Sequence, residues 1–280
     1  MKRLAIYATV LLFCVAVLNT DSRAEGELED GFTSLFNGTD LAGWVVPSGD
    51  NGHWKVVDGV IDYDARSESK GDRNLKTVDE FGDFILKVDW RLKETSGLYN
   101  MPIVLSDGSY LTGPDGKKIT IKTPNADSGL FLRGYSKAQL NIWCWSTGSG
   151  EVYGIRNSKD TPPEIRAAVT PRINADNPVG QWNSFVIVLI GDEATVLLNN
   201  HLVLEKAKLP GIPQRGPIVL QHHGGVDKQG NLSPASSLVQ FRNLWIKPLD
   251  AANDATTTDA AASAKKRTGK RERAEAKSAR

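Results

Sequence analysis

The sequence predicts an all-β protein, a sandwich of two antiparallel sheets, and three observations lead to that class. Most apolar residues fall in short runs in which apolar and polar side chains alternate, which is the period of a half-buried strand. Glycines separate these runs, with 26 of them in a chain of 280 residues. The signals that begin a helix occur in one segment of the predicted domain, residues 159–170.

The clearest strand covers residues 84–92. Its apolar side chains share one face, namely Phe84, Leu86, Val88, Trp90 and Leu92. Its charged side chains share the other face, namely Lys87, Asp89 and Arg91. We therefore expect one face of this strand in the core and the other in solvent.

Two hairpins are predicted from their turn residues. Residues 54–61 contain Asp58-Gly59, a pair that supplies the positive φ angles of a tight turn. Residues 195–204 contain Asn199-Asn200-His201 between two apolar runs, which predicts a second hairpin.

Three more strands are expected toward the carboxyl end. Residues 184–190 are continuously apolar, which indicates a strand covered on both faces. Residues 216–225 form a strand with a polar end, and residues 238–249 form the last strand. Residues 96–127 are long and polar, so we expect an extended loop that contains a hairpin.

The expected helix in residues 159–170 has its start signals in order. Thr161 and Glu164 have the spacing of a capping box, and proline occupies the first helical position.

The chain divides into three parts. Residues 1–24 have the form of a signal peptide, with a charged start, a short apolar run and the small-x-small site Ser22-Arg23-Ala24. An uncleaved anchor is the alternative, but the run is too short for a comfortable membrane span. Residues 25–249 are the predicted β-sandwich, and residues 250–280 are a predicted disordered basic tail because they hold nothing apolar larger than alanine. We therefore expect an exported protein without a stable membrane span after cleavage.

The charge distribution argues against a nucleic-acid partner. The net charge is +1. The basic residues are concentrated in residues 265–280, which leaves the predicted domain mildly acidic. An acidic body lacks the basic groove that a nucleic acid requires.

The mature chain holds a single cysteine, Cys144, because Cys14 lies in the predicted signal peptide. It shares a strand face with Leu140 and Ile142. We expect a buried thiol without a catalytic role, with a nucleophile as the alternative.

A candidate binding surface lies in residues 128–156, which read as three short strands separated by glycines. In the middle strand Gln139, Asn141 and Trp143 alternate with apolar residues and therefore share one face. In the third, Glu151 and Tyr153 are in phase. Aromatic rings beside amides suit a sugar, whose ring has an apolar face and a rim of hydroxyls. The alternative is a half-buried sheet whose solvent face happens to carry tryptophan.

A second candidate group follows a strand near residue 220. Gln221 and His223 share a face opposite Leu220, and two glycines follow, which permit the close approach of a ligand. A functional and a structural role for His223 remain equally open at this point.

The sequence also resembles the 3-keto-disaccharide hydrolase family over nearly all of residues 31–249. Seven segments in order carry the resemblance: L-F-N-G-T-D-L-A-G-W (35–44), W-K-V-V-D-G-V-I (54–61), F-I-L-K-V-D-W-R (84–91), D-S-G-L-F-L-R-G (127–134), G-Q-W-N (180–183), G-P-I-V-L-Q-H-H-G (216–224) and F-R-N-L-W-I-K-P-L (241–249). The resemblance implies a concanavalin A-like jelly roll of two antiparallel sheets. It also implies activity on glycosides whose C3 hydroxyl has been oxidised to a ketone.

Three positions depart from the family pattern. Members often read E-V-Q-I-W-D where this chain has Q-L-N-I-W-C, so Gln139 and Cys144 replace two acids. His222 replaces a further acid in the segment that keeps His223. A glutamine hydrogen-bonds a sugar but is not an ordinary general base.

The candidate residues can be given roles in an enzyme that removes the C2 proton of the 3-keto sugar, expels its C1 substituent and adds water. His223 and Glu151 are the candidate acid–base groups, and Arg133 is the candidate that polarises the ketone. Gln139, Asn141, Trp143, Tyr153 and Gln221 are the candidate substrate contacts. A divalent metal held by Asp89 or a histidine is possible, although no ligand spacing demands one.

Two other functions stay open. A non-catalytic carbohydrate-binding module would account for the replaced acids, because a fold alone does not decide activity. A structural or interaction protein is the third reading, and only the basic tail hints at it.

Overall fold

The protein is seen in a computed structural model that describes residues 31–50, 52–64, 74–95, 97–222, 225–226, 232–233 and 237–249. The predicted signal peptide, the predicted tail and His223 lie outside the described residues.

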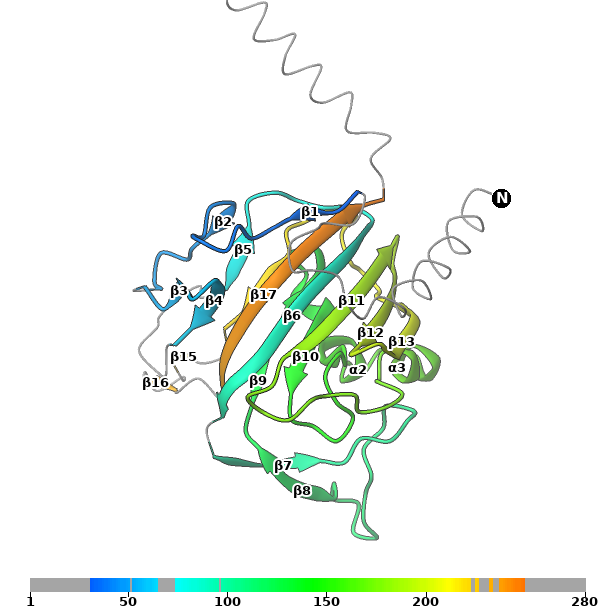
Figure 1. The fold of residues 1–280 in the computed structure, drawn as a ribbon. Helices are drawn as coiled ribbons and strands as arrows, with labels where there is room; N and C mark the ends of the chain where they lie inside the picture. The colour runs from blue at the N-terminus through cyan, green and yellow to red at the C-terminus, as the bar shows by residue number, and fades with distance from the viewer. Residues whose placement is uncertain are drawn as a thin grey trace, which may run out of the picture.

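Within those residues the fold is a sandwich of two antiparallel sheets, which confirms the predicted class (Figure 1). The large sheet has the order β13-β12-β11-β6-β17-β4-β3, and β1 pairs with β17. Its strands are β1 Thr33–Ser34, β3 Trp54–Val57, β4 Val60–Tyr63, β6 Phe84–Thr95, β11 Asn183–Ile190, β12 Glu193–Leu198, β13 His201–Lys208 and β17 Ser237–Pro248.

The small sheet has the order β10-β9-β14-β5-β2 and lies behind the large one in Figure 1. Its strands are β2 Trp44–Val45, β5 Leu75–Thr77, β9 Asp127–Phe131, β10 Gln139–Trp143 and β14 Val219–Gln221. Two short ribbons complete the strands, β7 Leu98–Pro102 with β8 Thr120–Pro124, and β15 Gly225–Val226 with β16 Leu232–Ser233.

The alternation predicted for residues 84–92 is confirmed in β6. Its inward side chains are buried in the core, and Lys87, Asp89 and Arg91 are only partly covered. The inward residues of β11, β10 and β9 meet them from the other strands, among them Phe185, Ile142 and Leu130. The continuous apolar run in β11 is explained by a second, smaller cluster, in which Val188 packs with Phe32 and Ile85 on the opposite face.

Both predicted hairpins are confirmed. Asp58 and Gly59 have φ angles of 50° and 75° between β3 and β4, and Asn199 and Asn200 have φ angles of 50° and 65° between β12 and β13. The polar segment 96–127 also forms the expected hairpin, because β7 pairs with β8.

The helix predictions need two corrections. Helix α3, Pro163–Ala168, is confirmed, but its N-cap is Pro162 and no side chain caps it. The Thr161 hydroxyl donates instead to the carbonyl of Ile155. A further helix, α2 Tyr153–Arg156, occupies the place of the third predicted strand of residues 128–156. Two 3-10 turns, η1 Leu132–Gly134 and η2 Ser136–Ala138, lead from β9 into β10.

Candidate functional site

A row of amides crosses the outer face of the small sheet. Asn141 on β10 and Gln221 on β14 both pair with Gly129 on the strand β9 between them. The Gln139 amide donates to the Gln221 side-chain oxygen at 2.6 Å and to the Ser128 carbonyl at 3.2 Å. Three of the predicted contact residues therefore gather on one face, as their alternation indicated.

Glycine at position 129 makes this amide pair possible. A Cβ atom there would lie 2.6 Å from the Leu140 carbonyl oxygen and within 2.8 Å of the Gln139 side chain. Real Cβ atoms do not approach so closely, so any side chain would displace Gln139. The open space above Gly129 is the path by which Gln139 reaches Gln221.

An aromatic group continues this face past the end of β10. The rings of Trp143 and Trp145 stack with centroids 4.1 Å apart and planes 4° apart. Tyr153 meets both tryptophans edge-on, and Tyr99 from β7 stacks over Trp145 with centroids 6.5 Å apart. Trp145 covers one face of Trp143, which is 5% exposed, so Trp145 and Tyr99 present the more accessible rings.

The expected in-phase pair of Glu151 and Tyr153 is not formed. Asn141 donates its N–H to the Glu151 carbonyl, so residue 151 runs beside β10, but the chain then turns into α2. As a result Glu151 is fully buried while Tyr153 is 37% exposed. Helix geometry at Tyr153 replaces the strand alternation on which the pairing depended.

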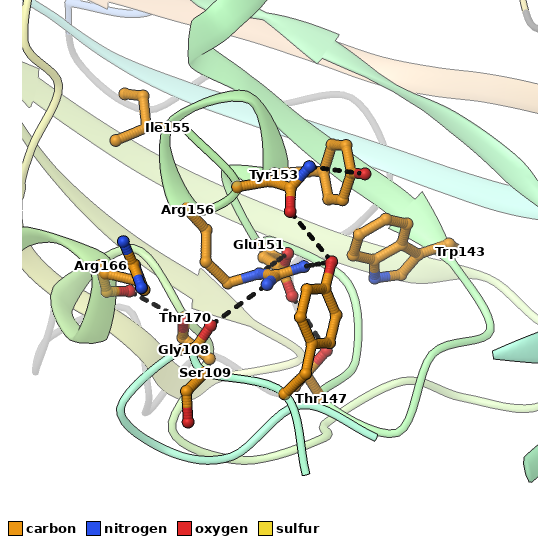
Figure 2. Close-up of polar contacts among 12 residues, drawn as sticks. Gly108, Ser109, Trp143, Thr147, Glu151, Tyr153, Ile155, Arg156, Arg166 and Thr170 are labelled. Atoms are coloured by element: carbon orange, nitrogen blue, oxygen red, sulfur yellow. Dashed lines mark hydrogen bonds and ion pairs between the residues drawn. The ribbon is translucent and has the colours of Figure 1, made fainter. Parts of the chain in front are cut away.

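Glu151 belongs to a buried ionic cluster (Figure 2). Its carboxylate forms an ion pair with the guanidinium of Arg156, and Thr147 donates to the other oxygen at 3.3 Å. Arg156 also donates to the carbonyl of Gly108 and to the hydroxyl of Tyr110, both at 3.2 Å. Both members of the pair are closed off from solvent, so the Glu151 carboxylate does not reach a molecule on the outer face in this arrangement.

Burial raises the pKa of Glu151, because loss of water disfavours the charged carboxylate. The adjacent Arg156 guanidinium opposes that shift and holds the negative charge at bonding distance. The cluster therefore ties helix α2 to the segment that follows β10 and to the segment of Gly108 and Tyr110.

Arg133 lies apart from the amide row. Its guanidinium is 2% exposed and donates to the carbonyls of Gly82, Gly191 and Pro213 and to the carboxylate of Asp83, at 2.8–2.9 Å. Four of its N–H groups are thus engaged in joining loops of the sandwich. The expectation that Arg133 converges with the other candidates is corrected, because the left-handed turn at residue 133, with φ at 50°, directs the chain away from β9.

The two remaining candidates are His223 and the suggested metal ligand Asp89. His223 is not among the described residues, so its role stays a prediction. Asp89, the suggested metal ligand, accepts from Asn243 at 2.8 Å and from Arg242 at 3.4 Å. Among the described residues, no group of three His, Cys, Asp or Glu side chains is placed to hold a metal ion.

Several residues of the site were not predicted from the sequence, among them Tyr99, Tyr110, Gly129 and Arg156. Tyr110 joins the Glu151 cluster from a segment that carries no motif. Arg156 ends the candidate segment 128–156, but strand alternation gives no sign of its ion pair with Glu151. Gly129 had a usable signal, because a glycine inside a strand marks a close approach of another group.

Fold and site together define the class, a β-sandwich of two antiparallel sheets that carries an amide and aromatic surface on its small sheet. Residues 31–247 match the family described as the 3-keto-alpha-glucoside-1,2-lyase-like domain. The chain belongs to this family, which confirms the resemblance seen in the seven sequence segments.

Solved structures match this chain at low sequence identity and with TM-scores below 0.5. A protein of Parabacteroides distasonis ATCC 8503, described as a proposed glycosyl hydrolase, is 20% identical with a TM-score of 0.47, over 82% of this chain and 99% of its own. Carbohydrate-binding module CBM66 of Bacillus subtilis is 15% identical with a TM-score of 0.36, over 78% of this chain and 95% of its own. At these TM-scores the likeness bears on neither substrate nor mechanism. No curated protein matches the chain.

No helix in the described part of the chain is both long and apolar enough to cross a membrane.

Proposed function

We propose that this protein is an exported enzyme that cleaves glycosides or disaccharides whose C3 hydroxyl has been oxidised to a ketone. The observation that carries the proposal is the family membership of residues 31–247, joined to an amide row beside stacked aromatic rings. Export is proposed from the signal-like residues 1–24.

The chemistry follows from the ketone. A carbonyl at C3 acidifies the proton at C2, and a base takes that proton while the electron pair forms the C1–C2 double bond. The substituent at C1 leaves with the bonding electrons and receives a proton from an acid. Water then adds across the double bond, with its hydroxyl at C1 and its proton at C2, which completes a net hydrolysis.

Of the two candidate acid–base residues, the proposal keeps His223, because the burial of Glu151 argues against a catalytic role for its carboxylate. Glu151 is fully buried and paired with Arg156, so its carboxylate serves the fold. His223 follows Gln221, which lies in the amide row, by two positions. Imidazole has a pKa near neutrality and therefore exchanges protons readily at the pH of function.

The neutral residues of the face would hold the sugar. Gln139 and Gln221, which are partly exposed, would hydrogen-bond its hydroxyls, and the accessible rings of Trp145, Tyr99 and Tyr153 would meet its apolar face. Asn141 and Trp143 are 4% and 5% exposed, so they would support this surface from beneath. Arg133 is left out of this set, because its guanidinium is already engaged with three carbonyls and Asp83.

The test is steady-state kinetics on a 3-keto-glucoside beside the same glucoside with an intact C3 hydroxyl. We expect turnover of the ketone alone, and a loss of roughly 10²-fold or more in His223→Ala. His201→Ala is the matched control, because His201 is exposed on β13 and belongs to the large sheet. Equal turnover in wild type and His223→Ala would remove His223 from the mechanism.

A non-catalytic carbohydrate-binding module is the second candidate, and one observation favours it. Glu151, the acid of the buried ionic cluster, is closed off from solvent. Gln139 and Cys144 occupy positions that carry acids in many family members. Binding of both sugars without turnover of either would support this alternative.

A further inference from the structure

Two arginines share one aromatic ring on the outer face of the large sheet, the face turned to the viewer in Figure 1. The guanidinium carbon of Arg91 on β6 lies 4.7 Å from the ring centroid of Trp182, and that of Arg242 on β17 lies 4.2 Å from it. Strand register explains the grouping, because Asp89 on β6 pairs with both Ser184 on β11 and Arg242 on β17. Arg91 and Trp182 are the next outward residues on their chains, so the three side chains meet.

Each arginine is held through its Nε atom and keeps its outer nitrogens available. Nε of Arg91 donates to Oε1 of Gln240 at 2.5 Å, and Nε of Arg242 lies 3.4 Å from Oδ2 of Asp89. In the described part of the chain, the Nη nitrogens of both arginines form no hydrogen bond, and none of them is buried. The two guanidinium groups are therefore oriented from behind and present their remaining donors to solvent.

The positive charge of this group is only partly neutralised. Arg91 bonds to a neutral amide and forms no ion pair with any described residue. Asp89 is the carboxylate beside Arg242, and Asp62, further along the face, is bonded to Lys93. Two cations and one carboxylate leave one net positive charge at this place, on a predicted domain that is otherwise mildly acidic.

The donors select the class of ligand. The Nη groups and the indole N–H of Trp182, which is neither paired nor buried in the described part of the chain, only donate. The ligand must therefore accept, and one net positive charge matches a single negative charge. A guanidinium fork matches the two oxygens of a carboxylate.

The spacing of the two arginines also suits a carboxylate. A carboxylate bonded from both sides at N–O distances of about 2.8 Å reaches guanidinium carbons up to about 8 Å apart. The two distances to the Trp182 ring limit the separation of these carbons to less than 9 Å. One carboxylate is therefore of the right size to bond both arginines.

The surroundings favour a sugar as the carrier of that carboxylate. Gln181 and Ser184, on either side of Trp182 in the sequence, are exposed and neutral, and their side chains suit hydroxyl groups. A nucleic acid is disfavoured, because the guanidinium groups of Arg91 and Arg242 lie over the ring on which a base would stack.

We propose that Arg91 and Arg242 bind the carboxylate of a uronic acid unit, at a site on the large sheet apart from the amide row of the small sheet. The choice of a sugar as the carrier rests on the proposed function. The carboxylate site itself rests on the two arginines and their ring.

The experiment is isothermal titration calorimetry with tetragalacturonate and with its methyl ester, which has the same sugar rings without the charges. We expect the methyl ester to bind roughly tenfold more weakly or less, and Arg91→Gln and Arg242→Gln each to weaken tetragalacturonate binding by a similar factor. Arg91→Lys should also weaken it, because an ammonium keeps the charge but lacks the planar fork. Arg172→Gln is the matched control, since Arg172 is exposed and paired with Glu205. Far-UV circular dichroism checks that each variant is folded.

The outcomes separate this inference from the proposed function. Equal binding of the methyl ester, unchanged affinity in Arg91→Gln and Arg242→Gln, or an equal loss in Arg172→Gln would overturn the carboxylate site. Tetraglutamate that binds as tightly as tetragalacturonate would overturn the choice of a sugar and indicate an acidic peptide. Turnover of the 3-keto-glucoside is measured in parallel on wild type. Tetragalacturonate binding without turnover would leave the site standing and remove the enzyme, and turnover without that binding would do the reverse.

Discussion

The amide of Gln139 on β10 donates to the side-chain oxygen of Gln221 on β14 at 2.6 Å, across the strand β9 that lies between them. The contact spans two strand spacings, about 10 Å in the hydrogen-bonding direction of a sheet. It forms only because the intervening residue, Gly129, has no side chain. One glycine therefore decides whether Gln139 and Gln221 are joined on the outer face of the small sheet.

The first prediction tests that relationship with Gly129→Ala. The new methyl group would overlap the Leu140 carbonyl and the Gln139 side chain, so the amide pair should break. We expect a loss of about 1–3 kcal/mol in the free energy of unfolding, typical of overpacking at a close contact. Urea denaturation measures it. In the control Gly113→Ala, the nearest atom is a flexible Asp115 side chain, and a change below about 0.5 kcal/mol is expected. Equal effects of the two substitutions would contradict the prediction.

The second prediction concerns Arg133, whose guanidinium joins three loop carbonyls and Asp83. Arg133→Met should lower the free energy of unfolding by about 2–3 kcal/mol, because the buried carbonyl of Gly82 and three partly covered acceptors lose a charged donor. Arg215→Met is the control, since Arg215 is exposed and donates to the Glu80 carbonyl, and it should cost under about 1 kcal/mol. Thermal and urea unfolding measure both. A stable Arg133→Met that loses turnover alone would restore the role in catalysis expected from sequence.

The sequence predicted the parts of this fold that depend on local patterns. Strand β6 follows from its alternation, and the turns at Asp58 and Asn199 follow from residues that tolerate positive φ angles. The side-by-side placement of Gln139 and Asn141 follows from the same alternation, because strand side chains repeat every two residues.

The parts that failed depend on a local turn and on contacts that the alternation of strand side chains does not encode. Glu151 and Tyr153 looked in phase, but the packing that draws Glu151 onto Arg156 ends the extended chain and begins α2. Arg133 looked like part of the site because it follows β9, yet its partners come from residues 82–83, 191 and 213. No pattern within residues 128–156 encodes those partners.

The third prediction concerns the reactivity of Cys144. Burial raises the pKa of its thiol to about 11, and the nearby carboxylate of Asp176 adds to the shift. An ordinary thiol has a pKa of about 8.5, so at that pH Cys144 should hold roughly one hundred times less thiolate. Alkylation by iodoacetamide in a Cys14→Ser background should therefore be slow at pH 8.5 and accelerate toward pH 11. Asp176→Asn should move the curve to lower pH. The same protein unfolded in urea should react as an ordinary thiol. Cys144 is only partly buried against the core, less than the sequence predicted, and a folded profile like the unfolded one would show that this burial does not protect its thiol.

The last prediction uses the pH dependence of the buried pair of Glu151 and Arg156. Burial already raises the pKa of Glu151 in the folded protein, and Arg156→Met removes the charge that opposes this shift. A carboxyl group whose folded pKa is raised binds its proton more tightly when folded. Its contribution to stability is therefore complete below the unfolded pKa, about 4.3, and is lost as the pH rises toward the folded pKa.

Arg156→Met should accordingly be close to wild type in stability near pH 4, and about 3–5 kcal/mol less stable near pH 8, where the carboxylate is charged, buried and unpaired. The double variant Glu151→Gln/Arg156→Met removes the titrating group. Its free energy of unfolding should therefore exceed that of Arg156→Met by an amount that grows as the pH rises. Arg242→Met is the matched control, because the side chain of Arg242 is 36% exposed beside Asp89, and a loss under about 1 kcal/mol without this pH trend is expected. Urea denaturation of the four proteins between pH 4 and pH 8 measures all of these differences. A deficit in Arg156→Met that is as large at pH 4 as at pH 8 would show that the guanidinium acts through packing and its bonds to Gly108 and Tyr110, and not through the charge of Glu151.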